Sequence, residues 1–242
     1  MSTVLSHGSP SRIKFCRLQN KLPTKTLTQR CDWARPAGGG KTMNFEKIIL
    51  ASASPRRRDL LSAGGYTHEV MVANIEEKRQ SGELPEHYVL RNAREKGLAV
   101  CSADPISTAK AIIISADTIV VAFDNEVLEK PSDANEARRM LGKLSARTHR
   151  VLTGYALCNG TTGEVLETQV VQTQVLFREL SVQEIDNYIA TGEPFDKAGS
   201  YGIQGYALTF VESIEGSYTN VVGLPMSQVA QSLQRYAIIT QD

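Results

Sequence analysis

Three patterns in the sequence predict a mixed α/β fold in which helices flank a twisted sheet. Residues 111–121 (AIIISADTIVV) form a nearly continuous β-branched run, which is typical of a central strand covered on both faces. Residues 151–159 and 165–177 predict two long strands joined as a hairpin across a turn at 159–163. Helix signals separate the other strand candidates without strict strand–helix–strand repetition, which favours a mixed sheet over a parallel one.

Charge is distributed unevenly along the 242 residues, although the net charge is only +1. Residues 1–42 hold many basic side chains and a single acidic one, so they carry about +7 and the remainder about −6. They lack apolar periodicity, and we expect them to form a disordered basic extension ahead of a domain at 43–242. Met43 stands just before the first strand, so an upstream translation start or a dispensable tail is favoured over an organelle signal.

Composition also argues against several partners and sites. The acidic balance of residues 43–242 argues against nucleic acid as the main partner. No apolar run approaches the ~20 residues of a membrane-spanning helix, and no secretory signal is recognisable, so we expect an intracellular protein without membrane partners. The four cysteines are Cys16, Cys31, Cys101 and Cys158. They form no CxxC pair and have no histidine at metal spacing, so we expect reduced thiols, with Cys101 and Cys158 partly buried.

The first predicted unit, residues 48–65, is a strand, a small-residue loop and a helix. Ser54 is placed as the N-cap, Pro55 stands at the first helical position, and two glycines follow the helix. The free N–H groups and dipole of a helix start favour an anion, and three guanidinium groups match phosphate oxygens: Arg56, Arg57 and Arg58. Basic residues oppose the dipole there, which points to function, while a solvated basic turn stays the alternative.

The next elements add two carboxylates and a cation. Residues 68–73 alternate as a short strand and lead into Glu76 and Glu77, for which a metal-ligand role and solvated loop charge are equally supported. Residues 86–100 predict a helix that carries Lys96 on its polar side. A charged helix face usually serves solubility, so only its context gives Lys96 a functional meaning.

Asp117 interrupts the apolar run at 111–121. A lone carboxylate in a buried strand is costly unless it is paired, binds a metal or opens into a cleft. We therefore consider Asp117 the strongest single candidate for a functional residue.

The middle of the chain offers one further cation and a histidine. Lys130 precedes the proline that ends a short strand at 127–131 and is placed to reach a cleft, although a solvated lysine is the commoner case. Asp133 and Glu136 predict the start of a helix that runs to about residue 144. His149 has no ligand-type residue at metal spacing, so we predict a hydrogen-bonded structural histidine.

The last third begins with a capping box, Ser181 and Glu184, for a helix that ends at Gly192. Residues 197–205 contain three glycines, which predict close approach of the backbone to a ligand. Neither GxGxxG nor GxxxxGK[ST] is present there, so Rossmann and Walker phosphate sites are not supported. A strand at 208–214 and a helix at 226–235 complete the prediction.

From residue 48 to about residue 233 the chain resembles the Maf family of nucleoside triphosphate pyrophosphatases. The motifs that carry the resemblance are SASPRR at 52–57, IEE at 75–77, REK at 94–96, ADT at 116–118, EKP at 129–131, TH at 148–149 with TG at 153–154, DKAG at 196–199, GIQG at 202–205 and VVGLP at 221–225. Each motif is short, but together and in this order they cover about four-fifths of the chain.

This resemblance implies a two-lobed fold similar to that of inosine triphosphate pyrophosphatases, with a cleft between the lobes. It implies a cytoplasmic homodimer that cleaves nucleotides between the α and β phosphates with a divalent metal, Mg²⁺ or Mn²⁺. By motif position the general base falls on Asp117, which with Glu77 also holds the metal. The other catalytic and phosphate contacts fall on Ser54, Arg57, Lys96, Lys130 and Gln204. Substrate choice falls on Arg56, Thr118 and Gln204.

The ADT and GIQG motifs resemble the branch that acts on dTTP and UTP, whereas the branch that prefers 7-methyl-GTP has Ser-Asp-Gln at the middle motif. The implied role is house-cleaning, which prevents incorporation of wrong nucleotides, with modified pyrimidine nucleotides as further targets. Hydrolysis of an α–β phosphoanhydride needs cations, a metal and a carboxylate, and these residues supply suitable groups.

Two alternatives stay open. One is a non-enzymatic nucleotide-binding regulator of cell division and septum formation, a role also linked with the family's name. The other is a purine-directed pyrophosphatase of the inosine triphosphate type. Asp117 argues against a pure phosphate binder, because without a metal its charge would oppose the ligand.

Overall fold

The computed structural model describes residues 45–72, 74–236 and 238, which belong to one compact unit, Gly40–Asp242. The predictions for residues 1–42, including those for Cys16 and Cys31, lie outside the described residues. None of the helices formed by the described residues is long and apolar enough to cross a membrane.

Seven strands of the described part form a single mixed sheet in the order β2-β1-β3-β5-β6-β7, with β4 paired to β3. Their bounds are β1 Lys47–Leu50, β2 Glu69–Val70, β3 Ala111–Val121, β4 Val127–Leu128, β5 Thr148–Asn159, β6 Val165–Phe177 and β7 Val211–Glu215. β1 runs parallel to β2 and β3, and the other pairs are antiparallel. The predicted mixed sheet, central strand and long hairpin are confirmed.

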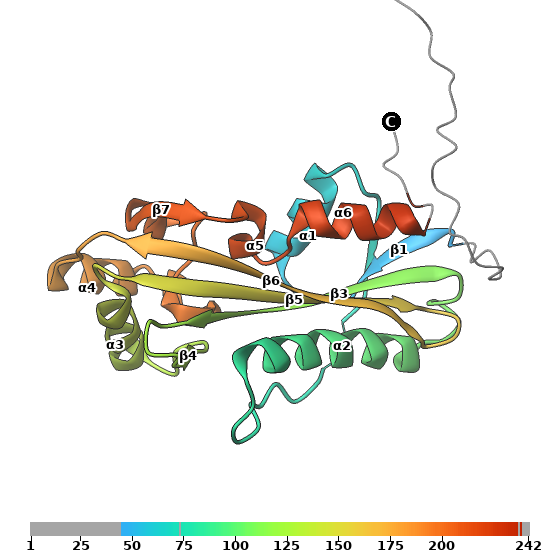
Figure 1. Ribbon diagram of the computed structural model, residues 1–242, viewed down its shortest axis with the longest axis horizontal. Helices are drawn as coiled ribbons and strands as arrows, with labels where there is room; N and C mark the ends of the chain where they lie inside the picture. The colour runs from blue at the N-terminus through green and yellow to red at the C-terminus, as the bar shows by residue number, and fades with distance from the viewer. Residues whose placement is uncertain (1–44, 73, 237, 239–242) are drawn as a thin grey trace, which may run out of the picture. The chain divides into compact units, whose positions relative to one another are not determined.

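Helices cover both faces of this sheet (Figure 1). The α-helices are α1 Pro55–Ala63, α2 Pro85–Ala103, α3 Ala134–Leu144, α4 Val182–Ala190, α5 Tyr218–Val222 and α6 Met226–Arg235. Short 3₁₀ turns are η1 Glu193–Asp196, η2 Ala198–Ser200 and η3 Tyr206–Thr209. Figure 1 shows α2 on one face of the sheet and α1 and α6 on the other. It shows α3 and α4 at the open end of the β5–β6 hairpin, opposite its turn.

Three predicted strands differ from the structure, and one helix was not predicted. The strand predicted at 127–131 pairs with β3 only over Val127–Leu128. The strand predicted at 208–214 begins only at Val211, because Ala207 and Phe210 are buried three residues apart and this spacing forms the turn η3. The strand predicted at 68–73 pairs only over Glu69–Val70, since its partner β1 ends at Leu50, and residue 73 lies outside the described residues. The unpredicted helix α5 starts where Ser217 accepts a hydrogen bond from the N–H of Asn220.

The side chains of β3 alternate between the two helical layers. Ile114 belongs to a hydrophobic cluster with Leu61 of α1 and Leu233 of α6, whereas Ile113 packs with Ala93 and Val100 of α2. Successive strand residues point to opposite faces. Asp117 therefore faces α2, and its neighbour Thr118 faces α1.

One edge of β3 changes partner along its length. Residues 111–114 pair with β1, and residues 120–121 pair with β4, while β5 pairs along the other edge. Among the described residues, no strand pairs with residues 115–119 on the β1 and β4 side. Ligands often bind where the connections of a sheet diverge. The sheet thus opens at Asp117.

Candidate active site

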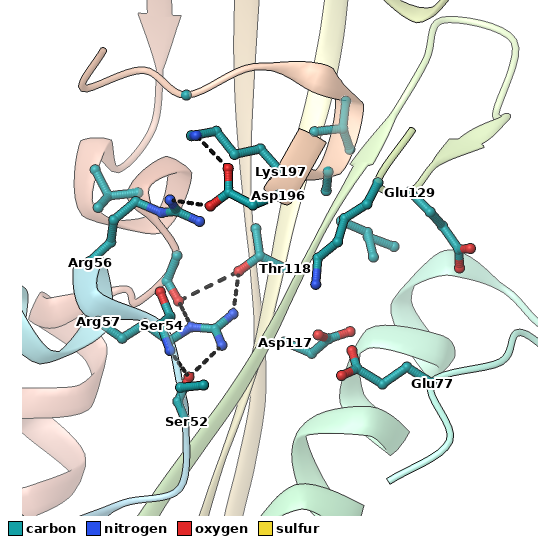
Figure 2. Close-up of a pocket in the computed structure, with 18 of the residues that line it drawn as sticks. Ser52, Ser54, Arg56, Arg57, Glu77, Asp117, Thr118, Glu129, Asp196 and Lys197 are labelled. Carbon is teal, nitrogen blue, oxygen red and sulfur yellow. Dashed lines mark hydrogen bonds and ion pairs between the residues drawn. The ribbon is translucent and has the colours of Figure 1, made fainter. Parts of the chain in front are cut away.

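A cavity of about 660 Å³ opens at this gap in the sheet, within the size range of small-molecule sites. It is lined by the loop and first turn of α1, by the centre of β3 and by residues of η1 and of the segment that follows it. All nine site residues predicted from the sequence line it: Ser54, Arg56, Arg57, Glu77, Lys96, Asp117, Thr118, Lys130 and Gln204. Figure 2 shows Asp117 and Glu77 close together and Arg57 beside Ser52 and Thr118.

Asp117 is held by two side chains of α2. Lys96 Nζ donates to Oδ1 at 2.7 Å, and Asn92 Nδ2 donates to Oδ2 at 2.9 Å. Only 6% of Asp117 is exposed. Burial raises the pKa of Asp117, but the charges of Lys96 and Arg57 and the bond from Asn92 outweigh burial, so the pKa lies below its ordinary value. The side chain is therefore a buried carboxylate that is ionised at neutral pH.

α2 can reach Asp117 because of a glycine on the neighbouring strand. Gly154 of β5 lies opposite Asp117, and a Cβ added to it would come within 2.7 Å of the carbonyl oxygen of Val89. No residue with a side chain fits there without moving the helix. The close packing places Asn92 and Lys96, one turn apart on α2, at the carboxylate.

Lys96 also joins Asp117 to Glu77. Its Nζ lies 2.8 Å from Glu77 Oε2, so two carboxylates converge on one ammonium group. One turn earlier than Asn92 on α2, Tyr88 donates to Glu129 Oε1 at 2.7 Å. In the described structure the buried Oδ1 of Asn92 accepts no hydrogen bond, so Asn92 is held through its contact with Asp117.

The carboxylates fit the expected kind of metal. The described residues contain no group of three or more His, Cys, Asp or Glu side chains that could hold a metal ion. Mg²⁺, however, is usually held by one or two carboxylates while phosphate oxygens and waters complete its octahedron. Asp117 and Glu77 supply such a pair, and both line the cavity.

Arg57 joins α1 to β3 and to the loop before α6. It is buried, and its guanidinium donates to the Gly223 carbonyl at 2.8 Å, to Ser52 Oγ at 3.0 Å and to Thr118 Oγ1 at 3.1 Å. Burial lowers the pKa of Arg57, and the charge of Asp117 opposes this effect. Thr118 Oγ1 also lies 2.9 Å from Thr153 Oγ1. Arg57 thus lines the cavity but uses most of its hydrogen-bonding capacity inside the protein.

At the start of α1 the predicted N-cap residue is confirmed, and the prediction that all three arginines face an anion is wrong for Arg58. Ser54 is the N-cap residue, but its side chain makes no capping hydrogen bond, and its N–H donates to Ser52 Oγ at 3.2 Å. Arg58 does not line the cavity and pairs with Asp59 at 3.7 Å. Neighbouring helix residues point in different directions, so three consecutive arginines cannot all face one ligand.

At the other end of the cavity, Asp196 lies between two cations (Figure 2). Its Oδ2 is 3.3 Å from Arg56 Nη1, and its Oδ1 is 2.6 Å from Lys197 Nζ. Lys130 and Gln204 also line the cavity with exposed side chains.

The glycines of the 202–205 motif pack against side chains of this chain. A Cβ on Gly202 would meet the Lys197 side chain at 2.6 Å, and one on Gly205 would meet the Glu193 carboxylate at 2.0 Å. These glycines make room for two side chains of this chain. Close approach of a ligand to Gly202, which lines the cavity, stays a prediction. The segment therefore seats Lys197 at the cavity.

Sequence reasoning gave no role to four residues that the structure brings to the site: Ser52, Asn92, Asp196 and Lys197. Asn92 is a polar residue one helical turn before Lys96, and this spacing was a usable signal. The other three belong to the quoted motifs SASPRR and DKAG, but nothing in their spacing identifies their partners.

The predictions for His149 and two cysteines are confirmed. His149 is buried, its Nε2 lies 2.8 Å from the Tyr201 hydroxyl, and burial lowers its pKa to about 4. It does not line the cavity. Cys101 and Cys158 are buried free thiols.

A family model described as Maf-like protein matches residues 47–236. The chain belongs to the Maf-like family. A dTTP/UTP pyrophosphatase from Vibrio cholerae serotype O1 is 51% identical to this Maf-like chain over 195 residues, covering 80% of this chain and 100% of the relative. A dTTP/UTP pyrophosphatase from Escherichia coli O157:H7 is 47% identical over 190 residues, covering 78% of this chain and 92% of the relative.

Among solved structures, a nucleoside-triphosphatase / dITP/XTP pyrophosphatase from Mycobacterium abscessus is 16% identical with a TM-score of 0.38, covering 79% of this chain and 95% of that chain. The family resemblance inferred from the motifs is confirmed by the family model and the relatives. The roles assigned to single residues of this Maf-like chain stay predictions.

Proposed function

We propose that this Maf-like chain hydrolyses dTTP and UTP, giving the nucleoside monophosphate and pyrophosphate. The observation that carries the proposal is the ionised carboxylate of Asp117, which opens into a cavity lined by Arg57, Lys96 and Lys130. The printed names of the relatives from Vibrio cholerae and Escherichia coli support this nucleotide class.

In the proposed reaction, Asp117 accepts the proton of a water that attacks the α-phosphorus. The new bond joins the water oxygen to the α-phosphorus, the bond between that phosphorus and the bridging oxygen breaks, and pyrophosphate leaves. Lys96 and Lys130 would neutralise the phosphate charge, and Lys130 has no ion-pair partner among the described residues. A divalent metal held by Asp117 and Glu77 would supply further charge neutralisation and acidify the water.

The first test is pyrophosphate release from dTTP, UTP, CTP, GTP, ITP and 7-methyl-GTP with Mg²⁺ or Mn²⁺. The wild type is compared with Asp117→Asn and with Asp186→Asn as a matched control, since Asp186 pairs with Arg138 and does not line the cavity. The proposal is supported if the wild type and the control hydrolyse dTTP and UTP and Asp117→Asn does not. No turnover by folded, metal-loaded wild type would favour the cell-division regulator, and a preference for ITP would favour the purine-directed enzyme.

We further propose that the enzyme works in the cytoplasm as a homodimer, as the family resemblance implies. Light scattering after gel filtration tests the dimer, and fractionation of cells that express the full chain tests the compartment. A monomer at micromolar concentration, or recovery with membranes, would contradict these two points.

A further inference from the structure

The rim of the cavity carries three polar side chains in an alternating row. Asp196 lies in the middle, with Arg56 Nη1 at 3.3 Å on one side and Lys197 Nζ at 2.6 Å on the other. Arginine and lysine are donors, and an ionised carboxylate is an acceptor. The row therefore presents donor, acceptor and donor.

Each member of the row keeps capacity for another bond. The Asp196 side chain is 65% exposed, and each carboxylate oxygen can accept more than one hydrogen bond. Lys197 uses two of its three ammonium donors, for Asp196 and for the Glu193 carbonyl at 2.6 Å. Of the five Arg56 donors, one is directed at Asp196 in the described structure. Burial raises the pKa of Asp196, but Lys197 and Arg56 outweigh burial and hold it below its ordinary value, which keeps the acceptor ionised.

This row complements one edge of a particular class of base. Uracil and thymine present a carbonyl oxygen, an N3–H donor and a second carbonyl oxygen, which is an acceptor, donor and acceptor pattern. Cytosine carries a lone pair at N3 and an amino group in place of one carbonyl. A carboxylate facing N3 therefore gains a hydrogen bond from uracil or thymine and is repelled by cytosine.

We infer that Asp196 is a specificity-determining residue that accepts the N3–H of a uracil or thymine base, while Arg56 and Lys197 donate to the two flanking carbonyl oxygens. The inference rests on the proposed pyrimidine substrates and names the residue that would select them. It also explains why a carboxylate lines a cavity built for an anion.

The position of the row leaves space for the triphosphate elsewhere in the cavity. Figure 2 shows Asp196, Lys197 and Arg56 apart from Asp117 and Glu77, with Thr118 and Arg57 between the two groups. Of these residues, Lys96 contacts only Asp117 and Glu77. The base end and the phosphate end are thus formed by different side chains.

The experiment replaces the acceptor with a group of the same shape. Asp196→Asn can turn an amide N–H toward N3, so kcat/KM for UTP should fall by about 10-fold or more while that for CTP rises. Asp59→Asn is the matched control, because Asp59 pairs with Arg58 on the exposed side of α1 and does not line the cavity. A parallel fall in kcat/KM for both nucleotides, or no change, would overturn the inference. A residue that only positions Arg56 would change kcat/KM for UTP and for CTP to the same extent.

A substrate probe covers the case in which Asp196→Asn does not fold. The wild type should hydrolyse N3-methyl-UTP at least about 10-fold less efficiently than 5-methyl-UTP, since only the first lacks the N3–H. Equal use of the two would overturn the inference. If the wild type hydrolyses no pyrimidine triphosphate, the proposed function fails. Equilibrium binding then tests the base site separately: the wild type should bind UTP more tightly than CTP, and Asp196→Asn should lose this preference.

Discussion

Lys96 Nζ lies 2.7 Å from Oδ1 of Asp117, inside the gap that interrupts the pairing of β3. Burial alone raises the pKa of Asp117, and Lys96 is the largest of the groups that lower it. Lys96→Met should therefore raise the pKa of Asp117, move the acidic limb of the kcat/KM profile to higher pH, and lower turnover by about 10²-fold. Pyrophosphate release measured across pH 5–9 checks this prediction.

The control for this change is Lys47→Met. Lys47 also forms an ion pair, with Glu69, but neither residue lines the cavity. Its profile should match that of the wild type. An acidic limb that stays in place in Lys96→Met would show that Lys96 does not set the charge of Asp117.

Arg57→Lys should lower both stability and turnover. A lysine cannot reproduce the three bonds to Gly223, Ser52 and Thr118, so the free energy of unfolding should fall by about 2 kcal/mol or more. Urea denaturation measures the change. Arg58→Lys, at an exposed position, should stay within about 0.5 kcal/mol of the wild type. Equal effects of the two substitutions would contradict the role of Arg57 as a link between elements.

Glu77→Gln should weaken the response to metal. Glu77 is one of the two carboxylates proposed to hold Mg²⁺ or Mn²⁺, so its loss should raise the metal concentration for half-maximal activity by about 10-fold or more. EDTA should abolish turnover of the wild type, and added Mg²⁺ should restore it. Glu76→Gln serves as control, because Glu76 is adjacent in sequence but does not line the cavity with Asp117. Unchanged metal dependence in Glu77→Gln would exclude Glu77 as a ligand.

His149 should make stability fall on acidification. Its pKa is about 4 in the folded protein, where burial lowers it, and about 6.5 in an unfolded chain. Between these values the unfolded chain binds the proton and the folded protein does not, so stability is lost as pH falls from about 6.5 to 4, by up to about 1.4 kcal/mol per pH unit. Above pH 6.5 both states are neutral and this contribution is constant.

Urea denaturation at pH 7.5, 6 and 5 checks this prediction. His149→Gln should lose less stability over this range than the wild type, because glutamine does not titrate. His87→Gln, at an exposed position of α2, should keep the wild-type slope. Identical slopes for all three proteins would show that His149 is not the titrating group.

Gly154→Ala should move α2 away from the sheet. The new Cβ would lie 2.7 Å from the Val89 carbonyl oxygen, and the overpacking should destabilise the protein by about 1–3 kcal/mol. Turnover should fall as well, since Asn92 and Lys96 reach Asp117 from that helix. Gly142→Ala, within α3 and with open space around its Cβ, should stabilise by about 0.5–1 kcal/mol. Thermal denaturation and a UTP assay on both variants distinguish the outcomes.

The elements with strong local signals were predictable from the sequence. β3 and α6 match the predicted bounds, because a continuous β-branched run and an amphipathic stretch directly after a proline leave little choice. The apolar residues near Phe210 carry no such signal, since a 3₁₀ turn and a strand bury similar side chains. Tertiary packing decides between them.

The site was predictable where a charged residue stood in an otherwise apolar strand. Asp117 stood out because a carboxylate does not belong in a buried strand without a partner. Asp196 did not stand out, because its meaning depends on Arg56, 140 positions away in the chain. Asn92 was marked only by its spacing from Lys96, since its partner Asp117 lies 25 positions away. Local patterns carry no information on such contacts until the fold is known.

The spacing of contacts along α2 limits how the gene can vary. Tyr88, Asn92 and Lys96 stand on successive turns and touch Glu129, Asp117 and Glu77. Inserting or deleting one codon between positions 88 and 96 would rotate the later contacts by about 100° and separate them from their partners. We therefore expect insertions and deletions among homologous genes in connections between elements, such as residues 104–110, and not within this helix.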